Sequence, residues 1–198
     1  AMAVATSPGA GEAHPSIWPS YDYPVTVPAS DRAMIADLLG RMTLEEKIGQ
    51  LVQADLCCVT PEDVKTYNLG SILVGGNSGP NGNDLAPAPE WLAAADDFYE
   101  QSVDKSDGGV GIPIIWGTDA VHGHANIIGA TVFPHNIGLG AARDPELIER
   151  IGAATAKEIR VTGQEWTFAP TVAVPQDFRW GRAYEGYSSD PQLVASYV

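Results

Sequence analysis

Cysteine is scarce in this sequence, and its placement excludes a disulfide framework. The chain of 198 residues has two cysteines, Cys57 and Cys58, which are adjacent. Adjacent cysteines rarely bridge, because so short a separation strains the disulfide geometry. Nor do any cysteines stand at the spacing of a metal-binding motif. The cysteine content therefore does not indicate whether the protein works in a reducing or an oxidising compartment.

Long apolar runs and a nucleotide-binding fingerprint are also missing. No apolar run approaches the roughly 18 residues that a membrane span needs, so we expect no membrane partner. No G-x-G-x-x-G sequence stands directly between a strand and a helix, which makes a dinucleotide-binding fold less attractive. Residues 1–9 have neither a basic region nor an apolar core, and so do not form an intact signal peptide.

Positive charge is scarce as well. The chain has 11 lysines and arginines against 25 aspartates and glutamates, which gives a formal net charge of −14. Such a chain is a poor partner for phosphate backbones, so nucleic acid is disfavoured. Anionic substrates and anionic membranes are disfavoured for the same reason, whereas neutral ligands are not.

Helix and strand patterns alternate along the chain. Residues 1–29 are predicted to be an extended N-terminal segment. Helix starts are predicted at Ser30, Thr43, Thr60, Pro89, Asp144 and Asp190, and strands at 71–74, 112–116 and 166–170. The first two helices are expected to bury the apolar residues Met34, Ile35, Leu38, Leu39 and Met42, and Ile48, Leu51 and Val52.

This alternation predicts a parallel sheet with right-handed crossovers. Three or four β/α units fit within residues 30–198, whereas a complete eight-fold barrel needs roughly 250 residues. The predicted fold class is therefore α/β, as the N-terminal part of a (β/α)₈ TIM-like barrel. Residues 30–198 are expected to form its first half, in a chain that we expect to be truncated.

A carboxylate follows the most strand-like run of the sequence. Residues 112–116 have the β-branched content of a buried strand, and the run leads into Asp119 and a long loop. The carboxyl ends of strands are where α/β sheets place ligand-handling groups. A carboxylate accepts from two hydroxyls at once, which suits a sugar ring. We expect Asp119 to bind a polar ligand; the alternative is a carboxylate that only caps the following turn.

His122 and His124 follow Asp119 and could be read as a pair of metal ligands. A metal needs several converging ligands, and the sequence has no further histidine apart from His14 and His135. We expect instead that both histidines hydrogen-bond to backbone within the long loop. No metal and no organic cofactor are predicted, and a metal-dependent hydrolase is the weaker alternative.

A second polar cluster spans residues 179–185. In one interpretation it is an ion-pair group on the surface. In the other, Arg182 donates a fork of hydrogen bonds to ligand hydroxyls while Glu185 orients the guanidinium.

Several motifs in order carry a resemblance to a known family. They are the runs 42–50 (MTLEEKIGQ), 70–77 (GSILVGGN), 119–123 (DAVHG) with 133–136 (FPHN), and 180–182 (WGR) with Glu185. Over residues 30–198 the chain resembles the N-terminal catalytic domain of glycoside hydrolase family 3. The resemblance is strongest to the exo-1,3/1,4-β-glucanase and β-glucosidase members.

The resemblance implies a sugar site and a reaction. The aspartate that matches Asp119 binds hydroxyls of the non-reducing-end glucose in subsite −1, and the arginine that matches Arg182 lies in the same subsite. Glu185 matches a carboxylate that supports this arginine. Family members hydrolyse with retention, through an aspartate nucleophile and a second carboxylate as acid/base. The nucleophile, the acid/base and a Lys-His pair are expected beyond residue 198, so no residue here is assigned a catalytic role.

The sequence therefore predicts part of a retaining exo-acting β-glucan hydrolase that releases glucose from non-reducing ends of β-1,3/1,4-glucans. We expect the isolated chain to be inactive, and the rest of the barrel and a second domain to be its partners. A secreted or periplasmic location is expected from the polymeric substrate. The alternative is a non-catalytic glucan-binding module on a degenerate barrel.

Overall fold

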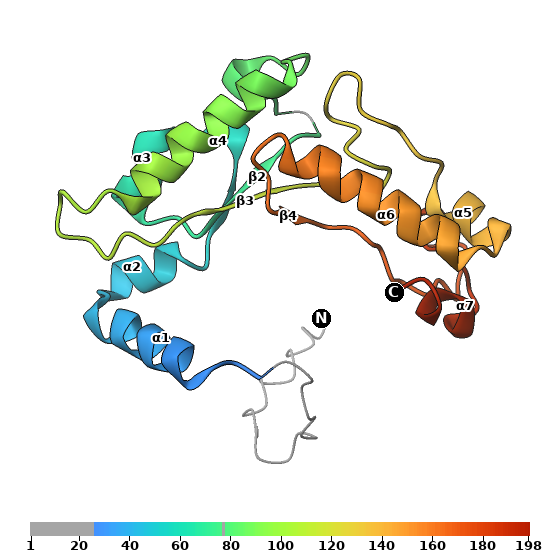
Figure 1. Cartoon of the computed structure of the whole chain (residues 1–198), viewed down its shortest axis with the longest axis horizontal. Coiled ribbons are helices and arrows are strands. Elements are labelled where there is room, and N and C mark those ends of the chain that lie inside the picture. Colours follow the sequence, from blue (N-terminus) through green and yellow to red (C-terminus); the bar gives the residue numbers. More distant parts are fainter. Residues whose placement is uncertain (1–25, 77) are drawn as a thin grey trace, which may run out of the picture. The chain divides into compact units, whose positions relative to one another are not determined.

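The computed structural model describes residues 26–76 and 78–198 (Figure 1). The chain divides into two units, Ala1–Asp37 and Leu38–Val198. The division falls inside helix α1, Ala29–Arg41. Most of the predicted extended segment, residues 1–25, lies outside the described residues.

Helix α1 does not bury the apolar face that its sequence predicts. All of its residues are described and none is buried, and the side chains of Met34, Ile35 and Leu39 are exposed. Only Met42, just past the end of the helix, is buried. The prediction of a buried face was therefore wrong for the helix itself, in which charged residues are interleaved with the apolar ones.

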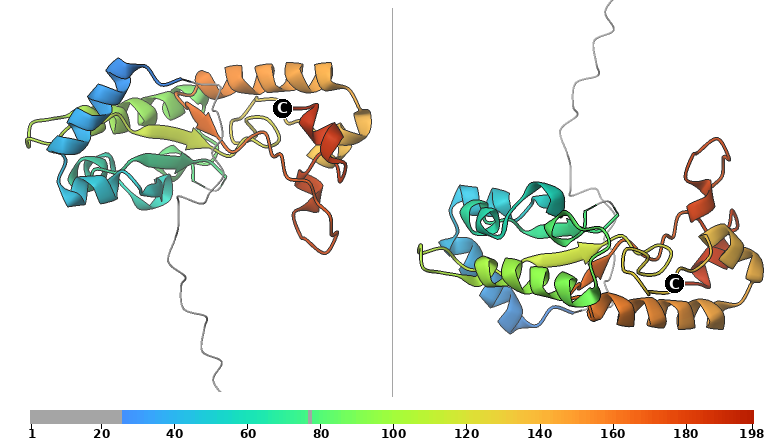
Figure 2. Two further views of the ribbon diagram at one scale, coloured as in Figure 1. Left: turned by 90° about the horizontal axis from the view of Figure 1, so that it is seen from below. Right: turned by 90° about the horizontal axis from the view of Figure 1, so that it is seen from above.

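The larger unit is built on a sheet of four parallel strands in the order β1-β2-β3-β4. The strands are β1 (Gln53–Asp55), β2 (Ser71–Val74), β3 (Ile115–Thr118) and β4 (Trp166–Thr167). Because all the pairs are parallel, the four carboxyl ends share one edge of the sheet. The loop after β3 and the segment that follows β4 both lie beyond this edge (Figure 2).

Most helices begin at the capping residues that the sequence indicates. The helices of the larger unit are α2 (Leu44–Gly49), α3 (Pro61–Tyr67), α4 (Ala88–Val103), α5 (Asn136–Ala142), α6 (Pro145–Arg160) and α7 (Pro191–Ala195). Thr43 and Thr60 form capping boxes, and Asp144 and Asp190 cap α6 and α7 from their side chains. Short 3₁₀ turns occur at η2 (Leu56–Cys58), η3 (Pro80–Gly82) and η4 (Ala183–Glu185).

Helix α2 faces the interior with its polar side. Ile48, Leu51 and Val52 are exposed, and Glu46 is buried instead, so the predicted apolar face was wrong. The carboxylate of Glu46 accepts from the Thr43 amide at 2.7 Å and from the Val110 amide at 3.3 Å. These two backbone donors account for the orientation, because a buried carboxylate needs hydrogen-bond partners.

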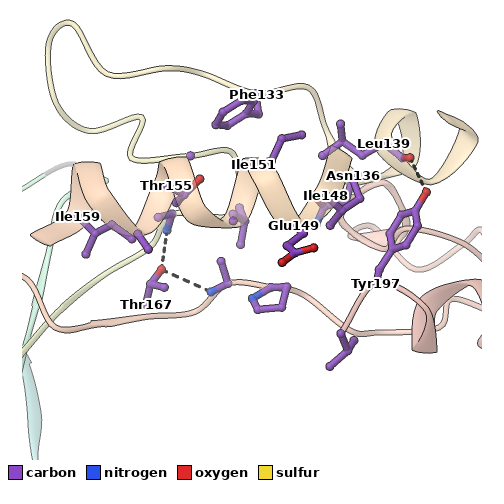
Figure 3. Close-up of a pocket in the computed structure, with 18 of the residues that line it drawn as sticks. Phe133, Asn136, Leu139, Ile148, Glu149, Ile151, Thr155, Ile159, Thr167 and Tyr197 are labelled. Carbon is purple, nitrogen blue, oxygen red and sulfur yellow. Dashed lines mark hydrogen bonds between the residues drawn. The ribbon is translucent and has the colours of Figure 1, made fainter. Parts of the chain in front are cut away.

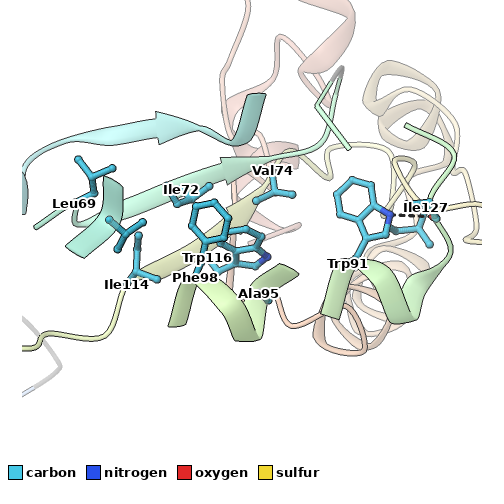
Figure 4. Close-up of a cluster of buried hydrophobic side chains, with 11 residues drawn as sticks. Leu69, Ile72, Val74, Trp91, Ala95, Phe98, Ile114, Trp116 and Ile127 are labelled. Atoms are coloured by element: carbon cyan, nitrogen blue, oxygen red, sulfur yellow. Dashed lines mark hydrogen bonds between the residues drawn. The ribbon is translucent and has the colours of Figure 1, made fainter. Parts of the chain in front are cut away.

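The main core lies between α4 and the middle of the sheet (Figure 4). Trp91, Ala95 and Phe98 of α4 pack with residues of β2 and β3, and the rings of Phe98 and Trp116 lie 4.9 Å apart. Ile72 and Val74 of β2 are completely buried. This core fixes β2 and β3, and with them the starting points of the loops at the carboxyl edge.

A groove of about 590 Å³ runs along α6 (Figure 3). Its walls include Ile148, Ile151 and Ile159 of α6 and, opposite, Ala169 and Pro170 of the segment after β4. A second apolar cluster closes one end of the unit, where Tyr197 donates to the Leu139 carbonyl at 3.0 Å. Across the described residues, no helix is long and apolar enough to cross a membrane.

Candidate active site

Asp119 stands where the sequence predicts, directly past the end of a strand. Strand β3 begins at Ile115, later than predicted, and ends at Thr118. The backbone around Asp119 is held on two sides: its carbonyl accepts from Asn126 Nδ2 at 3.1 Å, and the next amide, that of Ala120, donates to Thr167 Oγ1 at 3.2 Å. The residue is exposed at the carboxyl edge. The two hydrogen bonds therefore fix the backbone that carries the carboxylate, and the residue itself is open to solvent.

Asn126 ties the loops after β2 and β3 together. Its Oδ1 accepts from the Gly76 amide at 2.8 Å, and its Nδ2 donates to Thr118 Oγ1 at 3.1 Å. Gly75 has a positive φ of 103°, and a Cβ there would collide with the Asn126 side chain. Asn126 was not predicted, because one asparagine in a long loop carries no signal of its own.

Arg182 and Glu185 form a bidentate ion pair. Arg182 Nε donates to Glu185 Oε1 at 2.8 Å, and the guanidinium NH2 group donates to Oε2 at 2.6 Å. The Glu185 side chain is 10% exposed and that of Arg182 is 64% exposed. The carboxylate is thus held in the protein while the guanidinium reaches out from it, which is the arrangement predicted for a supported arginine.

The ion pair shifts the pKa of both partners. The hydrogen bonds from Arg182 lower the pKa of Glu185 below its usual value. The pKa of Arg182 is raised, first by its hydrogen bonds to Glu185 and, more weakly, by the charge of Asp119. The charge of Asp119 therefore reaches Arg182, and Glu185 holds Arg182 directly, as expected from the sequence.

The site also contains histidines whose partners differ from the prediction. His122 Nε2 lies 3.0 Å from His135 Nδ1, and the His135 ring meets that of Tyr184 edge-on at 4.9 Å. Among the described residues, the buried Nδ1 atom of His122 has no hydrogen-bond partner. Burial, and then the charge of His135, lowers the pKa of His122, while Glu185 and Asp119 act in the opposite direction.

His124 points away from this site into the core. It is completely buried, and its Nε2 lies 2.9 Å from Thr162 Oγ1. Thr162 already donates its hydroxyl hydrogen to the Ile159 carbonyl at 2.8 Å, so the histidine must be the donor in this contact. The expectation that both histidines bond to backbone was wrong, because each instead has a side-chain partner at 3.0 Å or less.

The histidines do not converge on a metal position. His122 and His124 contact different partners, and no group of three or more His, Cys, Asp or Glu side chains within residues 26–76 and 78–198 could hold a metal ion. What the site does offer is an exposed carboxylate acceptor, a fork of guanidinium donors and the exposed ring of Tyr184, which lies against His135. Such a set suits a neutral polyhydroxyl ligand.

A hydrogen bond from a side chain to the backbone joins the segment around Glu185 to helix α5. Asn136, which is buried at the start of α5, donates through Nδ2 to the Glu185 carbonyl at 2.8 Å. A Cβ at Gly140, one turn further along α5, would collide with the Tyr187 carbonyl. The segment that bears Glu185 therefore packs directly on α5, and its position depends on this close approach.

Comparison with known proteins also indicates a carbohydrate ligand. Residues 43–198 match the glycosyl hydrolase family 3 N terminal domain. The periplasmic beta-glucosidase of Salmonella typhimurium is 33% identical over 174 residues, which cover 88% of this chain and 20% of that protein. The lysosomal beta glucosidase of Dictyostelium discoideum is 30% identical over 175 residues, which cover 81% of this chain and 21% of that protein.

A solved structure is closer in sequence. The exo-1,3/1,4-beta-glucanase from a Pseudoalteromonas species is 53% identical, with a TM-score of 0.82 over 87% of this chain and 22% of that chain. The chain spans about a fifth of the length of these relatives. Since the named relatives are glucosidases and a glucanase, the comparisons do not favour the non-catalytic alternative, and the fold is the N-terminal part of a TIM-like barrel.

Proposed function

The chain belongs to glycosyl hydrolase family 3 as its N-terminal domain, and from this premise we propose that it builds the sugar-binding part of an exo-acting β-glucan hydrolase. The enzyme would release glucose from the non-reducing ends of β-1,3/1,4-glucans with retention of configuration. Support comes from the relatives named above, which are two β-glucosidases and an exo-1,3/1,4-β-glucanase.

The observation that carries the proposal is the Arg182–Glu185 ion pair, together with Asp119 at the carboxyl edge of the parallel sheet, whose charge reaches Arg182. In this proposal Asp119 accepts hydrogen bonds from two hydroxyls of the terminal glucose. Arg182 donates to a neighbouring hydroxyl, and Glu185 holds the guanidinium in place. A neutral sugar also fits the acidic chain, since it is not repelled by the formal charge of −14.

None of these residues is proposed as the nucleophile or the acid/base. The retaining mechanism needs two carboxyl groups about 5–5.5 Å apart on either side of the glycosidic bond. Asp119 is instead assigned to sugar hydroxyls, and the two reacting carboxylates belong to the part of the relatives that this chain does not span. The rest of a barrel and a second domain are thus proposed partners, and the two-carboxylate chemistry calls for no metal or organic cofactor.

The test uses the full-length protein and an aryl β-glucoside. We expect Asp119→Asn and Arg182→Lys each to lower kcat/KM by at least roughly a hundredfold, because both change groups that contact the reacting sugar. The matched control is Arg179→Lys, since Arg179 also pairs with an aspartate, Asp177, on the same segment but is 91% exposed. Loss of activity in the control alone, or in none of the three, would reject the assignment.

A second assay asks whether the isolated chain has any turnover. The 198-residue chain alone should show no turnover of the same glucoside, because the two reacting carboxylates are not assigned to it.

The proposed location is secreted or periplasmic, in line with the periplasmic relative from Salmonella typhimurium. Fractionation of cells that express the full-length protein checks this location, and recovery in the cytosol alone would contradict it.

A further inference from the structure

The two cysteines occupy one tight turn at the carboxyl end of β1. Cys57 and Cys58 lie in η2, both are exposed, and their Sγ atoms are 2.6 Å apart. The turn is fixed by Asp55, the last residue of β1, whose Oδ1 accepts from the Cys57 amide at 3.0 Å. Adjacency in sequence alone favours no contact between the two sulfurs; the conformation of η2 brings them together.

The separation is closer than two unbonded sulfur atoms normally lie. We propose that Cys57 and Cys58 are a redox modification site, at which the two thiols close reversibly to a vicinal disulfide when a small-molecule disulfide is present. Both cysteines are free in the structure, in line with the expectation from sequence that adjacent cysteines rarely bridge; the proposal concerns what an added disulfide would do to them. The proposal concerns this turn alone and does not depend on the sugar site.

The reaction balances by thiol–disulfide exchange. The Cys58 thiolate attacks one sulfur of a disulfide such as oxidised glutathione, forms a mixed disulfide and releases one thiolate. Cys57 then loses its proton and attacks the Cys58 sulfur, which breaks the mixed disulfide and releases the second thiolate. The protein is oxidised by two electrons, and the glutathione disulfide is reduced to two molecules of glutathione.

The order of attack follows from the surroundings of Cys57. Its pKa is raised to about 12, first by the hydrogen bond with Cys58 and then by Asp55. Cys57 is therefore held in its thiol form at neutral pH, which makes it the resolving rather than the attacking residue. Asp55 itself is held as a carboxylate: burial acts to raise its pKa, but hydrogen bonds, first from the Cys57 amide and then from Ser78, together lower it.

Closure is expected to be reversible. Adjacent Cα atoms across a trans peptide are about 3.8 Å apart, below the roughly 4.4–6.8 Å usual for disulfides. Such a bond is more reducible than an ordinary structural one, and its exposure lets small thiols reach it. The pair also lies at the same sheet edge as Asp119, because β1 and β3 run parallel in one sheet.

The experiment follows the reduced chain in oxidised glutathione by intact mass and by thiol titration. The folded chain is expected to lose two hydrogens and both titratable thiols, with no glutathione retained, and to regain both thiols in dithiothreitol. Closure should be at least roughly tenfold faster than for the same chain unfolded in urea, because the fold pre-positions the sulfurs. Lasting mixed disulfides, covalent dimers, or equal rates with and without urea would each overturn the proposal.

Two single variants test the roles of the sulfurs. Cys57→Ser should retain one glutathione, because the attacking thiol is present and the resolving thiol is not. Cys58→Ser should take up glutathione more slowly than Cys57→Ser. In Asp55→Asn, which removes the negative charge beside Cys57, closure should be faster than in the parent chain. Slower uptake by Cys57→Ser than by Cys58→Ser would contradict the proposed order of attack.

Discussion

At the scale of single residues, Glu185 makes the most direct prediction. Its carboxylate fixes the Arg182 guanidinium through two hydrogen bonds, so Glu185→Gln keeps the shape of the side chain but loses the charge and one acceptor. We expect kcat/KM for an aryl β-glucoside to fall by roughly one to two orders of magnitude in the full-length protein. The matched control, Asp177→Asn on the exposed Arg179 pair, should leave kcat/KM within about twofold.

The histidine pair gives a second prediction for single residues. Burial and the charge of His135 lower the pKa of His122, so His122 stays neutral to a lower pH than an ordinary histidine. In His135→Gln the opposing charge is removed while a hydrogen-bonding group remains. We expect the pKa of His122 to rise but to stay below its usual value, because it is still partly buried.

An NMR titration of the imidazole nitrogens measures this shift. His124 is the internal reference, since its contacts are to Thr162 and Trp91 and not to His135. A His122 pKa that is unchanged or lower in the variant would show that the two rings do not share the predicted electrostatic contact.

Sequence motifs identify the charged residues of this site but not the residues that hold them. Asp119, Arg182 and Glu185 stand out because a strand end or a charged cluster marks them. Asn126 contacts Gly76 of a different loop, 50 residues away in sequence, and His122 contacts His135 of its own loop, 13 residues away. Both contacts depend on the paths of irregular loops. No periodic pattern encodes such a loop path, so these neighbours emerge only from the structure.

At the scale of elements, α5 is the piece on which the Glu185 segment rests. Gly140→Ala would place a methyl group against the Tyr187 carbonyl, whereas Gly138→Ala would only reach the Pro134 side chain at 3.9 Å. We expect Gly140→Ala to lower the free energy of unfolding by about 1–3 kcal/mol through overpacking. The control, Gly138→Ala in the same helix, should be neutral or stabilising by up to about 1 kcal/mol.

Urea unfolding of the two variants decides between them. The midpoint should fall for Gly140→Ala at an unchanged slope, which reports a loss of stability and not a change in the denatured state. Equal midpoints for the two variants would mean that the close approach of α5 to Tyr187 does not constrain the fold.

Helices with strong capping signals were predicted, whereas elements with weak local signals were missed. The starts of α3, α6 and α7 follow from a Thr or Asp before a proline, and all three helices begin at that proline. Strand β1 was missed because Gln53–Asp55 has no β-branched residue, and α5 was missed because two of its seven residues are glycines. In both cases packing within the sheet or against Tyr187 overrides a weak local preference.

At the scale of the whole molecule, the alternation of helix and strand gave the architecture. The parallel order β1-β2-β3-β4 is the one expected when strands that are consecutive in sequence pair side by side. Burial was predicted less well, because Ile48 and Leu51 are exposed while Glu46 and His124 are inside. A carboxylate or an imidazole is buried where specific donors or acceptors meet it, and two of these partners, Val110 for Glu46 and Thr162 for His124, are remote in sequence.

The buried His124 makes stability depend on pH. Its Nε2–H donates to Thr162, so a second proton would have to go onto Nδ1, which is buried and has no partner among the described residues. Burial lowers its pKa from 6.5 to about 4. Between these two values the unfolded chain binds a proton that the folded chain does not, so the contribution of His124 is complete above pH 6.5 and is lost as the pH falls toward 4.

The loss over this range is on the order of 3 kcal/mol, since each pKa unit corresponds to about 1.4 kcal/mol. Urea unfolding at several pH values between about 4 and 7 measures it, in the parent chain and in His124→Gln.

Other acidic groups also weaken the fold in acid, so the prediction concerns the difference between the two chains. The variant should be less stable at neutral pH, but its free energy of unfolding should change less across this pH range. His135→Gln is the control for the other histidine pair: it changes the contribution of His122 but leaves His124 in place, so most of the parent slope should persist. Equal slopes in the parent chain and in His124→Gln would mean that His124 takes up its proton in the folded chain as readily as in the unfolded one.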